Sequence, residues 1–197
     1  MKKFCEKKYV LFDFDGVIAD TEESNGNYLG LALKEFGVEL TQKDRDRLIG
    51  SHDSHILLGL LERSPEKITM EQLLQKRKEI GNTYENGCIK PMEGLLELIA
   101  GLKKQGKKLA VVSSTSTRLI VVALNRMKML GLFDVVVCGD MCRNRKPDPE
   151  CYRKAMQYLE AKPEYCFNAD YCVGNQKRWK FPGNGWRHRN VDFRIYL

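Results

Sequence analysis

Short apolar segments that each end in a polar loop alternate with helical patterns along most of this chain, and this alternation limits the possible folds more than any other feature. The segments that we predict to be strands span residues 9–12, 108–112, 134–138 and 165–170. Apolar residues at helical spacing predict helices over 93–105 and 116–130, and Asp148 is predicted to cap a further helix with Pro149 in its first turn. Strands that alternate with helices in this way predict a parallel sheet covered on both faces, and therefore an α/β fold.

Residues 18–87 interrupt the alternation, because they contain only helical patterns. The predicted helices of this stretch span roughly 21–36, 42–49, 53–62 and 69–86. We expect a capping box at the start of the first of them, with Asp20 as the N-cap and Glu23 reaching back to it. The pattern therefore predicts a helical subdomain that is inserted directly after the first strand.

Polar side chains follow three of the predicted strands. Asp13 and Asp15 come directly after the first strand, and a turn at Gly16 can bring both carboxylates to one pocket. Ser113 follows the second strand and Asp170 ends the fourth. Because ligands of parallel sheets bind beyond the carboxyl ends of the strands, this edge is the predicted site.

The net charge of +7 raises the question of a nucleic-acid partner. Residues 174–197 hold six Lys or Arg and a single Asp, so this short segment supplies most of the excess. We therefore expect no nucleic-acid partner. No apolar run approaches the roughly 20 residues of a membrane span, and we expect no membrane partner either.

Seven cysteines occur without a Cys-x-x-Cys pair, and no apolar stretch follows the lysines at the start of the chain. Reduced cysteines and the lack of a signal-peptide pattern lead us to expect a cytoplasmic protein. We expect the cysteines to be buried small hydrophobes rather than metal ligands.

Four segments together resemble the motifs of haloacid dehalogenase superfamily phosphatases, in the branch of the β-phosphoglucomutases and phosphoglycolate phosphatases. In chain order they are Phe12–Glu22, Val111–Ser114, Arg145–Tyr152 and Ala169–Gly174. The resemblance covers residues 8–174. It implies an α/β fold whose Rossmann-like parallel sheet core comprises residues 1–17 and 88–174, with an all-helical cap domain at 18–87.

The resemblance also implies a role for each residue at the strand ends. Asp13 would attack phosphorus and form an aspartyl-phosphate, and Asp15 would act as the general acid and then the general base. Ser113 would donate a hydrogen bond to a phosphoryl oxygen, and Lys146 would pair with Asp13 and the phosphate. Mg²⁺ would be held by Asp13, the Asp15 carbonyl and Asp170. The implied protein is a monomeric phosphatase that hydrolyses a small phosphorylated metabolite.

Two departures from the family pattern lie within the motifs and the cap. Ala169 stands where an acidic residue usually precedes Asp170. Asn25 and Asp53 stand where the mutases carry His and Arg, which favours a phosphatase over a sugar-phosphate mutase; His52 and His55 lie nearby, and we expect them to be exposed.

A third departure is the end of the chain. Residues 175–197 lack a helical apolar period and hold both tryptophans, Trp179 and Trp186. We hypothesise that this atypical basic tail is a frameshifted readout of the usual helix and strand, which the other reading frames of the coding DNA would reveal. The alternative to a frameshift is a genuinely divergent tail. As alternative functions, a sugar-phosphate mutase, a catalytically impaired product and nucleic-acid binding by the basic end, where the tryptophans could stack on bases, stay open.

Overall fold

The polypeptide forms two compact units. The computed structural model describes residues 7–48, 54–144, 146, 148–171 and 191–192. The unit that we call the sheet unit consists of Met1–Asp20 and Lys90–Leu197, and the helical unit consists of Thr21–Ile89. Among the described residues, no helix is both long and apolar enough to cross a membrane.

The sheet unit is organised around parallel strands, which confirms the predicted α/β fold. The strands are β1 (Tyr9–Phe12), β2 (Lys108–Val112), β3 (Val135–Val137) and β4 (Cys166–Tyr171), and they lie in the order β3-β2-β1-β4. β1 is the central strand and pairs in parallel with β2 on one side and β4 on the other. All of these strands therefore end at the same edge of the sheet.

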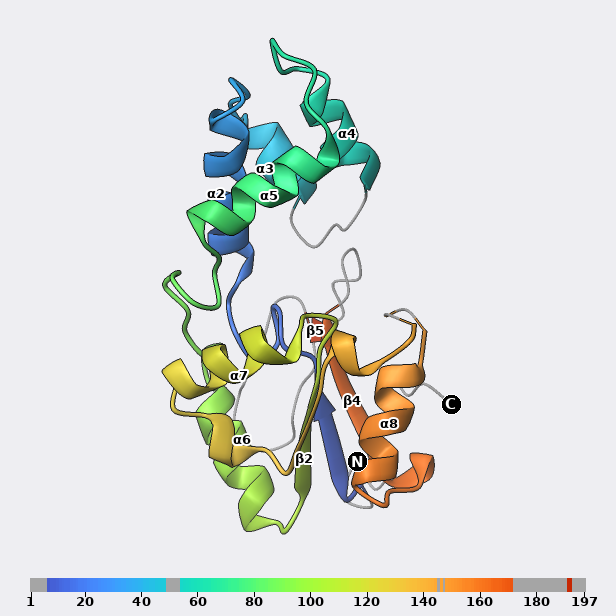
Figure 1. Ribbon diagram of the computed structural model, residues 1–197. Coiled ribbons are helices and arrows are strands. Elements are labelled where there is room, and N and C mark those ends of the chain that lie inside the picture. The colour runs from blue at the N-terminus through green and yellow to red at the C-terminus, as the bar shows by residue number, and fades with distance from the viewer. Residues whose placement is uncertain (1–6, 49–53, 145, 147, 172–190, 193–197) are drawn as a thin grey trace. The chain divides into compact units, whose positions relative to one another are not determined.

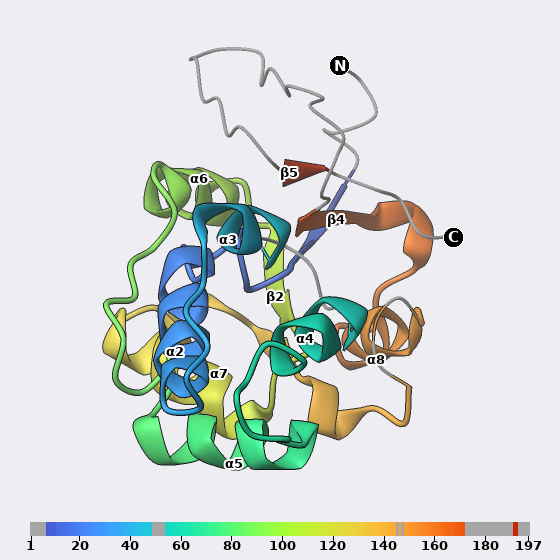
Figure 2. The ribbon, with the colours of Figure 1, turned by 90° about the horizontal axis from the view of Figure 1, so that it is seen from above.

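Helices flank the parallel strands on both sides, as Figures 1 and 2 show. α6 (Leu95–Lys104) and α7 (Thr117–Arg126) lie on one side and α8 (Glu150–Tyr158) on the other. α8 packs Tyr152 and Ala155 onto a cluster that includes Leu11 of β1 and Ala110 of β2. Burial on both faces explains why these strands are almost continuously apolar.

A fifth strand was not predicted. β5 (Val191–Asp192) pairs with β4 in the antiparallel direction. It lies within the atypical tail of residues 175–197. The remaining residues of the atypical tail, with Trp179 and Trp186, lie outside the described residues.

The helices of the sheet unit begin or end at other residues than predicted, and the reason is clear for two of them. α7 ends at Arg126 rather than at residue 130, because Lys128 adopts a positive φ of 57° that a helix cannot accommodate. α8 begins at Glu150 with Pro149 at the N-cap position, so Asp148 is not the N-cap. Because proline has no N–H, the Asp148 carboxylate instead accepts a hydrogen bond from the Glu150 amide at 2.8 Å.

The helical unit contains the predicted run of helices. They are α2 (Glu22–Lys34), α3 (Gln42–Leu48), α4 (Ser54–Leu61) and α5 (Met70–Ile80). Their apolar faces meet in a core that includes Leu33 of α2, Leu60 of α4 and Leu73 of α5. α5 ends at Ile80, well before residue 86, because Gly81 adopts a φ of +114°.

The predicted capping box at Asp20 and Glu23 is wrong. Thr21 occupies the N-cap position of α2 and makes no capping hydrogen bond with its side chain, whereas the Asp20 amide donates to the Lys90 carbonyl at 3.2 Å. A capping box does form at the start of α5, where Thr69 and Gln72 exchange side-chain and backbone hydrogen bonds.

Candidate active site

The first motif forms a tight turn at the end of β1. The Asp13 amide donates to the Ala169 carbonyl at 2.7 Å, which continues the pairing of β1 with β4. The chain then turns at Gly16, whose φ of +72° favours glycine, and the amides of Ile18 and Ala19 both donate to the Phe14 carbonyl. This turn holds the half-buried carboxylates of Asp13 and Asp15 at the carboxyl edge of the sheet.

Lys146 lies against Asp13. Its ammonium Nζ is 2.9 Å from Oδ1 of Asp13, and each side chain keeps only 16% of its surface exposed. Nζ also donates to the Val112 carbonyl at 2.8 Å, and it lies 4.9 Å from the centre of the Tyr152 ring. Because the carbonyl and the ring both favour a cation, the positive charge is held in place beside the carboxylate.

Ser113 lies at the end of β2 and is fully buried. Its amide donates to the Val137 carbonyl at 3.0 Å, and its Oγ accepts a hydrogen bond from the Thr115 amide at 3.1 Å. The hydroxyl proton of Ser113 is therefore the part of this side chain that can be donated to a ligand.

Thr115 connects this loop to the first motif, and we did not single it out from the sequence. Its hydroxyl donates to Oδ2 of Asp15 at 3.5 Å. The only sequence signal for it was its place in the hydroxyl-rich run that begins at Ser113. Gly139 allows this loop to pack closely, because a Cβ there would lie 2.1 Å from the Ser114 carbonyl oxygen.

The backbone of Asp170 lies next to Asp13 across the sheet. β4 pairs in register with β1, with Ala169 opposite Phe12, so Asp170 follows at the same edge. The Ala169 side chain is 1% exposed. The side chain of Asp170 lies outside the described residues, and among the residues that were described no three His, Cys, Asp or Glu side chains gather into a metal site.

The structure thus brings the predicted residues of the sheet unit to one edge. Asp13 contacts Lys146, whereas Asp15 is connected to Ser113 through Thr115. A carboxylate beside a fixed ammonium, with a second carboxylate and a hydroxyl nearby, can attack an electron-poor phosphorus and transfer a proton.

The cap residues that we singled out lie in the helical unit. Asn25 accepts a hydrogen bond from the Thr83 hydroxyl at 2.7 Å, which gives its side chain a role within that unit. His55 is exposed, as expected. His52 and Asp53 lie outside the described residues.

Comparisons with known proteins agree with this geometry. A phosphorylated carbohydrates phosphatase from Thermotoga maritima is 30% identical over 155 residues, which are 79% of this chain and 72% of that protein. Pyrophosphatase PpaX from Bacillus thuringiensis (strain Al Hakam) is 28% identical over 158 residues, covering 79% of this chain and 70% of the relative. The solved structure of a candidate β-phosphoglucomutase from Thermotoga maritima matches with a TM-score of 0.65 at 29% identity, over 82% of this chain and 74% of the other.

The sequence model of one protein family also matches this chain. The haloacid dehalogenase-like hydrolase model matches residues 10–168, which is most of the chain and includes the first three motifs. The resemblance is thereby confirmed at the level of the family, while the fourth motif begins just beyond the matched residues. The chain belongs to the haloacid dehalogenase-like hydrolases.

Proposed function

We propose that this hydrolase is a Mg²⁺-dependent phosphatase that cleaves a small phosphorylated metabolite through an aspartyl-phosphate on Asp13. The observation that carries the proposal is the contact between the Asp13 carboxylate and the Lys146 ammonium at the carboxyl edge of the sheet. A phosphate ester and a carboxylate are both anionic, so they repel each other unless a cation lies where they meet. Lys146 supplies that charge from within the protein.

Each side chain then has a step to perform. Asp13 attacks phosphorus while Asp15 protonates the leaving oxygen, and the Asp15 carboxylate afterwards takes a proton from the water that hydrolyses the aspartyl-phosphate. The Thr115 hydroxyl orients Asp15 for both proton transfers. Ser113 donates its hydroxyl proton to a phosphoryl oxygen, since its own Oγ already accepts from the Thr115 amide.

The donor groups at this edge fit Mg²⁺. The Asp13 carboxylate, the Asp15 carbonyl and Asp170 are all oxygen donors, and the register of β4 with β1 brings Asp170 alongside Asp13. Bound Mg²⁺ would neutralise charge on the phosphoryl group during transfer. Ala169 takes part in strand pairing with a buried side chain, so its lack of a carboxylate leaves these three donors in place.

We propose that residues 1–17 and 88–174, nearly all of which belong to the sheet unit, form the catalytic core, and that residues 18–87 form the cap that selects the substrate. The separation of the helical unit as a compact body supports this division. The Asn25 side chain accepts a hydrogen bond from the Thr83 hydroxyl, and this supports a phosphatase over a mutase, because the family resemblance puts Asn25 where the mutases carry histidine. The relatives named as acting on phosphorylated carbohydrates and pyrophosphate make both compound classes test substrates. We also propose that the protein is a monomer and is located in the cytoplasm.

The test is hydrolysis of p-nitrophenyl phosphate and of a panel of sugar phosphates and pyrophosphate. Wild type and Asp13→Asn are compared, each with Mg²⁺ and with EDTA, and Asp46→Asn serves as the control because Asp46 is an exposed carboxylate outside the four motifs. We expect turnover that requires Mg²⁺, at least about a thousand-fold loss in Asp13→Asn, and none in Asp46→Asn. Equal turnover in wild type and Asp13→Asn would reject the mechanism. Isomerisation of a sugar phosphate that requires the corresponding bisphosphate would instead support a mutase. Absence of turnover with every substrate would support a catalytically impaired product.

A further inference from the structure

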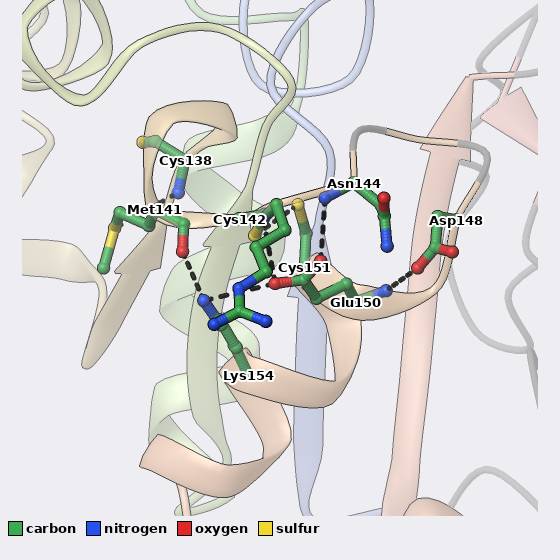
Figure 3. A network of polar contacts seen from close by, with 9 residues as sticks. Cys138, Met141, Cys142, Asn144, Asp148, Glu150, Cys151 and Lys154 are labelled. Carbon is green, nitrogen blue, oxygen red and sulfur yellow. Dashed lines mark hydrogen bonds and ion pairs between the residues drawn. The ribbon is translucent and has the colours of Figure 1, made fainter.

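Two cysteine thiols meet at the ends of the loop that carries Lys146. The Cys151 thiol donates to the sulfur of Cys142, and the two sulfur atoms are 2.8 Å apart (Figure 3). Cys151 is fully buried in α8, whereas Cys142 is half-buried. We call these two residues the thiol pair.

Polar contacts hold the two ends of the loop together without help from the sulfurs. The Glu150 carboxylate accepts hydrogen bonds from the amides of Arg143 at 3.0 Å and Asn144 at 2.8 Å. Lys154 forms an ion pair with Glu150 at 3.3 Å and also donates to the Met141 carbonyl. Figure 3 shows these contacts around the thiol pair. The residues after Cys142 are therefore fixed to the residue before Cys151.

This arrangement prepares the two sulfurs for a covalent bond. The S–S bond of a disulfide is about 2.05 Å long, so the sulfurs need to approach by less than about 1 Å. The other described cysteines have different surroundings. Cys88 is exposed, Cys138 is buried, and the Cys166 thiol contacts the Lys162 carbonyl at 3.4 Å.

From this geometry we infer that Cys142 and Cys151 are a site of reversible oxidation, at which a small-molecule disulfide converts the thiol pair into a disulfide bond. The Cys142 thiolate attacks one sulfur of the small disulfide and expels the first small thiolate. The Cys151 thiolate then attacks Cys142 in the mixed disulfide and expels the second. Two protein thiols and one small disulfide become one protein disulfide and two small thiols, so electrons and protons balance.

The order of the two attacks follows from accessibility. Burial, and after it the hydrogen bond to Cys142, raise the pKa of the Cys151 thiol to about 12 against the opposing charge of Lys146. Cys142 is the more accessible sulfur and meets the oxidant first. Cys151 reacts second, and the short distance between the sulfurs compensates for its small thiolate fraction.

The bond would close a ring of ten residues, 142–151, around Lys146. A short covalent ring reduces the freedom of the unfolded chain and thereby stabilises the fold. The oxidised protein therefore melts at a higher temperature than the reduced protein. This inference does not depend on the proposed phosphatase activity, since its readouts are covalent chemistry and melting temperature.

The test equilibrates the purified protein in mixtures of reduced and oxidised glutathione. The protein is then quenched in acid, unfolded, alkylated at its remaining thiols, digested and analysed by mass spectrometry. We expect Cys142 and Cys151 to lose alkylation together and to appear in one cross-linked peptide, while the exposed Cys88 is found as a free thiol or with glutathione and in no cross-linked peptide. Dithiothreitol should restore both thiols. The melting temperature of wild type should rise by several degrees on oxidation.

Variants separate this pair from the other cysteines. Cys142→Ser and Cys151→Ser should each abolish the cross-link and the rise in melting temperature, and Cys88→Ser should retain both. Cys142→Ser replaces a half-buried residue, so this variant tests the inference even where Cys151→Ser fails to fold. The inference is overturned where both residues stay alkylated under fully oxidising conditions. It is equally overturned where Cys142 carries glutathione while Cys151 remains a thiol, or where either residue is linked to a different cysteine.

Discussion

The sheet unit and the helical unit both contain close ion pairs, but the pairs differ in how far water reaches them. In the sheet unit, Lys146 and Asp13 each expose only 16% of their side-chain surface. In the helical unit, the Arg63 side chain that contacts Asp44 is 42% exposed. Removing one partner of an ion pair that is shielded from water destabilises the protein much more than removing one partner of a solvent-exposed pair. The shielding of the Lys146–Asp13 pair supports our proposal that the chemistry takes place in the sheet unit.

The largest effect in this comparison is expected for Lys146→Met. Removing the ammonium takes away the charge that faces Asp13 and the incoming phosphate, so kcat should fall by about a hundred-fold or more. Steady-state hydrolysis of p-nitrophenyl phosphate measures this. Lys103→Met is the matched control, because Lys103 pairs with Asp134 in the same unit and is 36% exposed. Loss of less than threefold in Lys146→Met, or equal loss in both variants, would contradict the comparison.

The next effect is a loss of stability that is confined to the helical unit. Leu73 is fully buried in its core, so Leu73→Ala should lower the free energy of unfolding by about 2–5 kcal/mol. Leu74→Ala is the control, because Leu74 is the next residue along the helix and is 46% exposed. Amide hydrogen exchange should show faster exchange in α2 and α5 and unchanged protection in β1 and β2. Equal loss of protection in both units would show that they unfold as one.

A smaller effect is expected for Thr115→Val, which removes the hydroxyl that donates to Asp15. One hydrogen bond of this kind contributes about 1 kcal/mol, so kcat should fall about fivefold while Thr115→Ser keeps most of the activity. Thr117→Val is the control, because the Thr117 hydroxyl donates to Asp140 instead. The pH profile of kcat is a second measurement, because Thr115→Val would leave this profile unchanged if Thr115 had only a structural role. An unchanged rate and profile would remove Thr115 from the site.

The smallest effect concerns the pH dependence of the helical unit. The hydrogen bond from Arg63, followed by those from the hydroxyl and amide of Thr41, lowers the pKa of Asp44 from 3.8 to about 2. Since the folded pKa is depressed, this stabilisation is present above about pH 4 and is lost as the pH falls towards 2. Asp44→Asn should therefore cost at most about 1 kcal/mol at pH 7 and nothing near pH 2.

Thermal melts at a series of pH values test this difference. Asp46→Asn is the control, because Asp46 is an exposed carboxylate on the same helix and contacts Gln42. The difference between Asp44→Asn and wild type should shrink as the pH falls. A constant difference at every pH would show that Asp44 acts through something other than its charge.

The sheet and the residues at its edge could be predicted because their signals are local. An apolar strand that ends in Asp13 and Asp15, and another that ends in Ser113, specify both the element and the position of the polar groups. Parallel pairing then brings the strand ends together without further information.

Features that depend on backbone strain or on distant partners could not be predicted in this way. The end of α7 depends on the positive φ of Lys128, a residue that ordinarily continues a helix. The contact of Thr115 with Asp15 joins residues 100 positions apart, and nothing in the run of five hydroxyl residues from Ser113 to Thr117 distinguishes Thr115. The pairing of β5 with β4 is likewise set by tertiary contact rather than by local sequence.

The central claim is that Asp13 carries the phosphoryl group, and trapping that intermediate tests it most directly. p-Nitrophenolate leaves without needing a proton, so Asp15→Asn should still be phosphorylated by p-nitrophenyl phosphate but should release phosphate slowly. After acid quenching and digestion, mass spectrometry should find one phosphoryl group on the peptide that contains Asp13, at higher occupancy in Asp15→Asn than in wild type. Phosphate on another residue, or turnover in Asp13→Asn at the wild-type rate, would contradict the account.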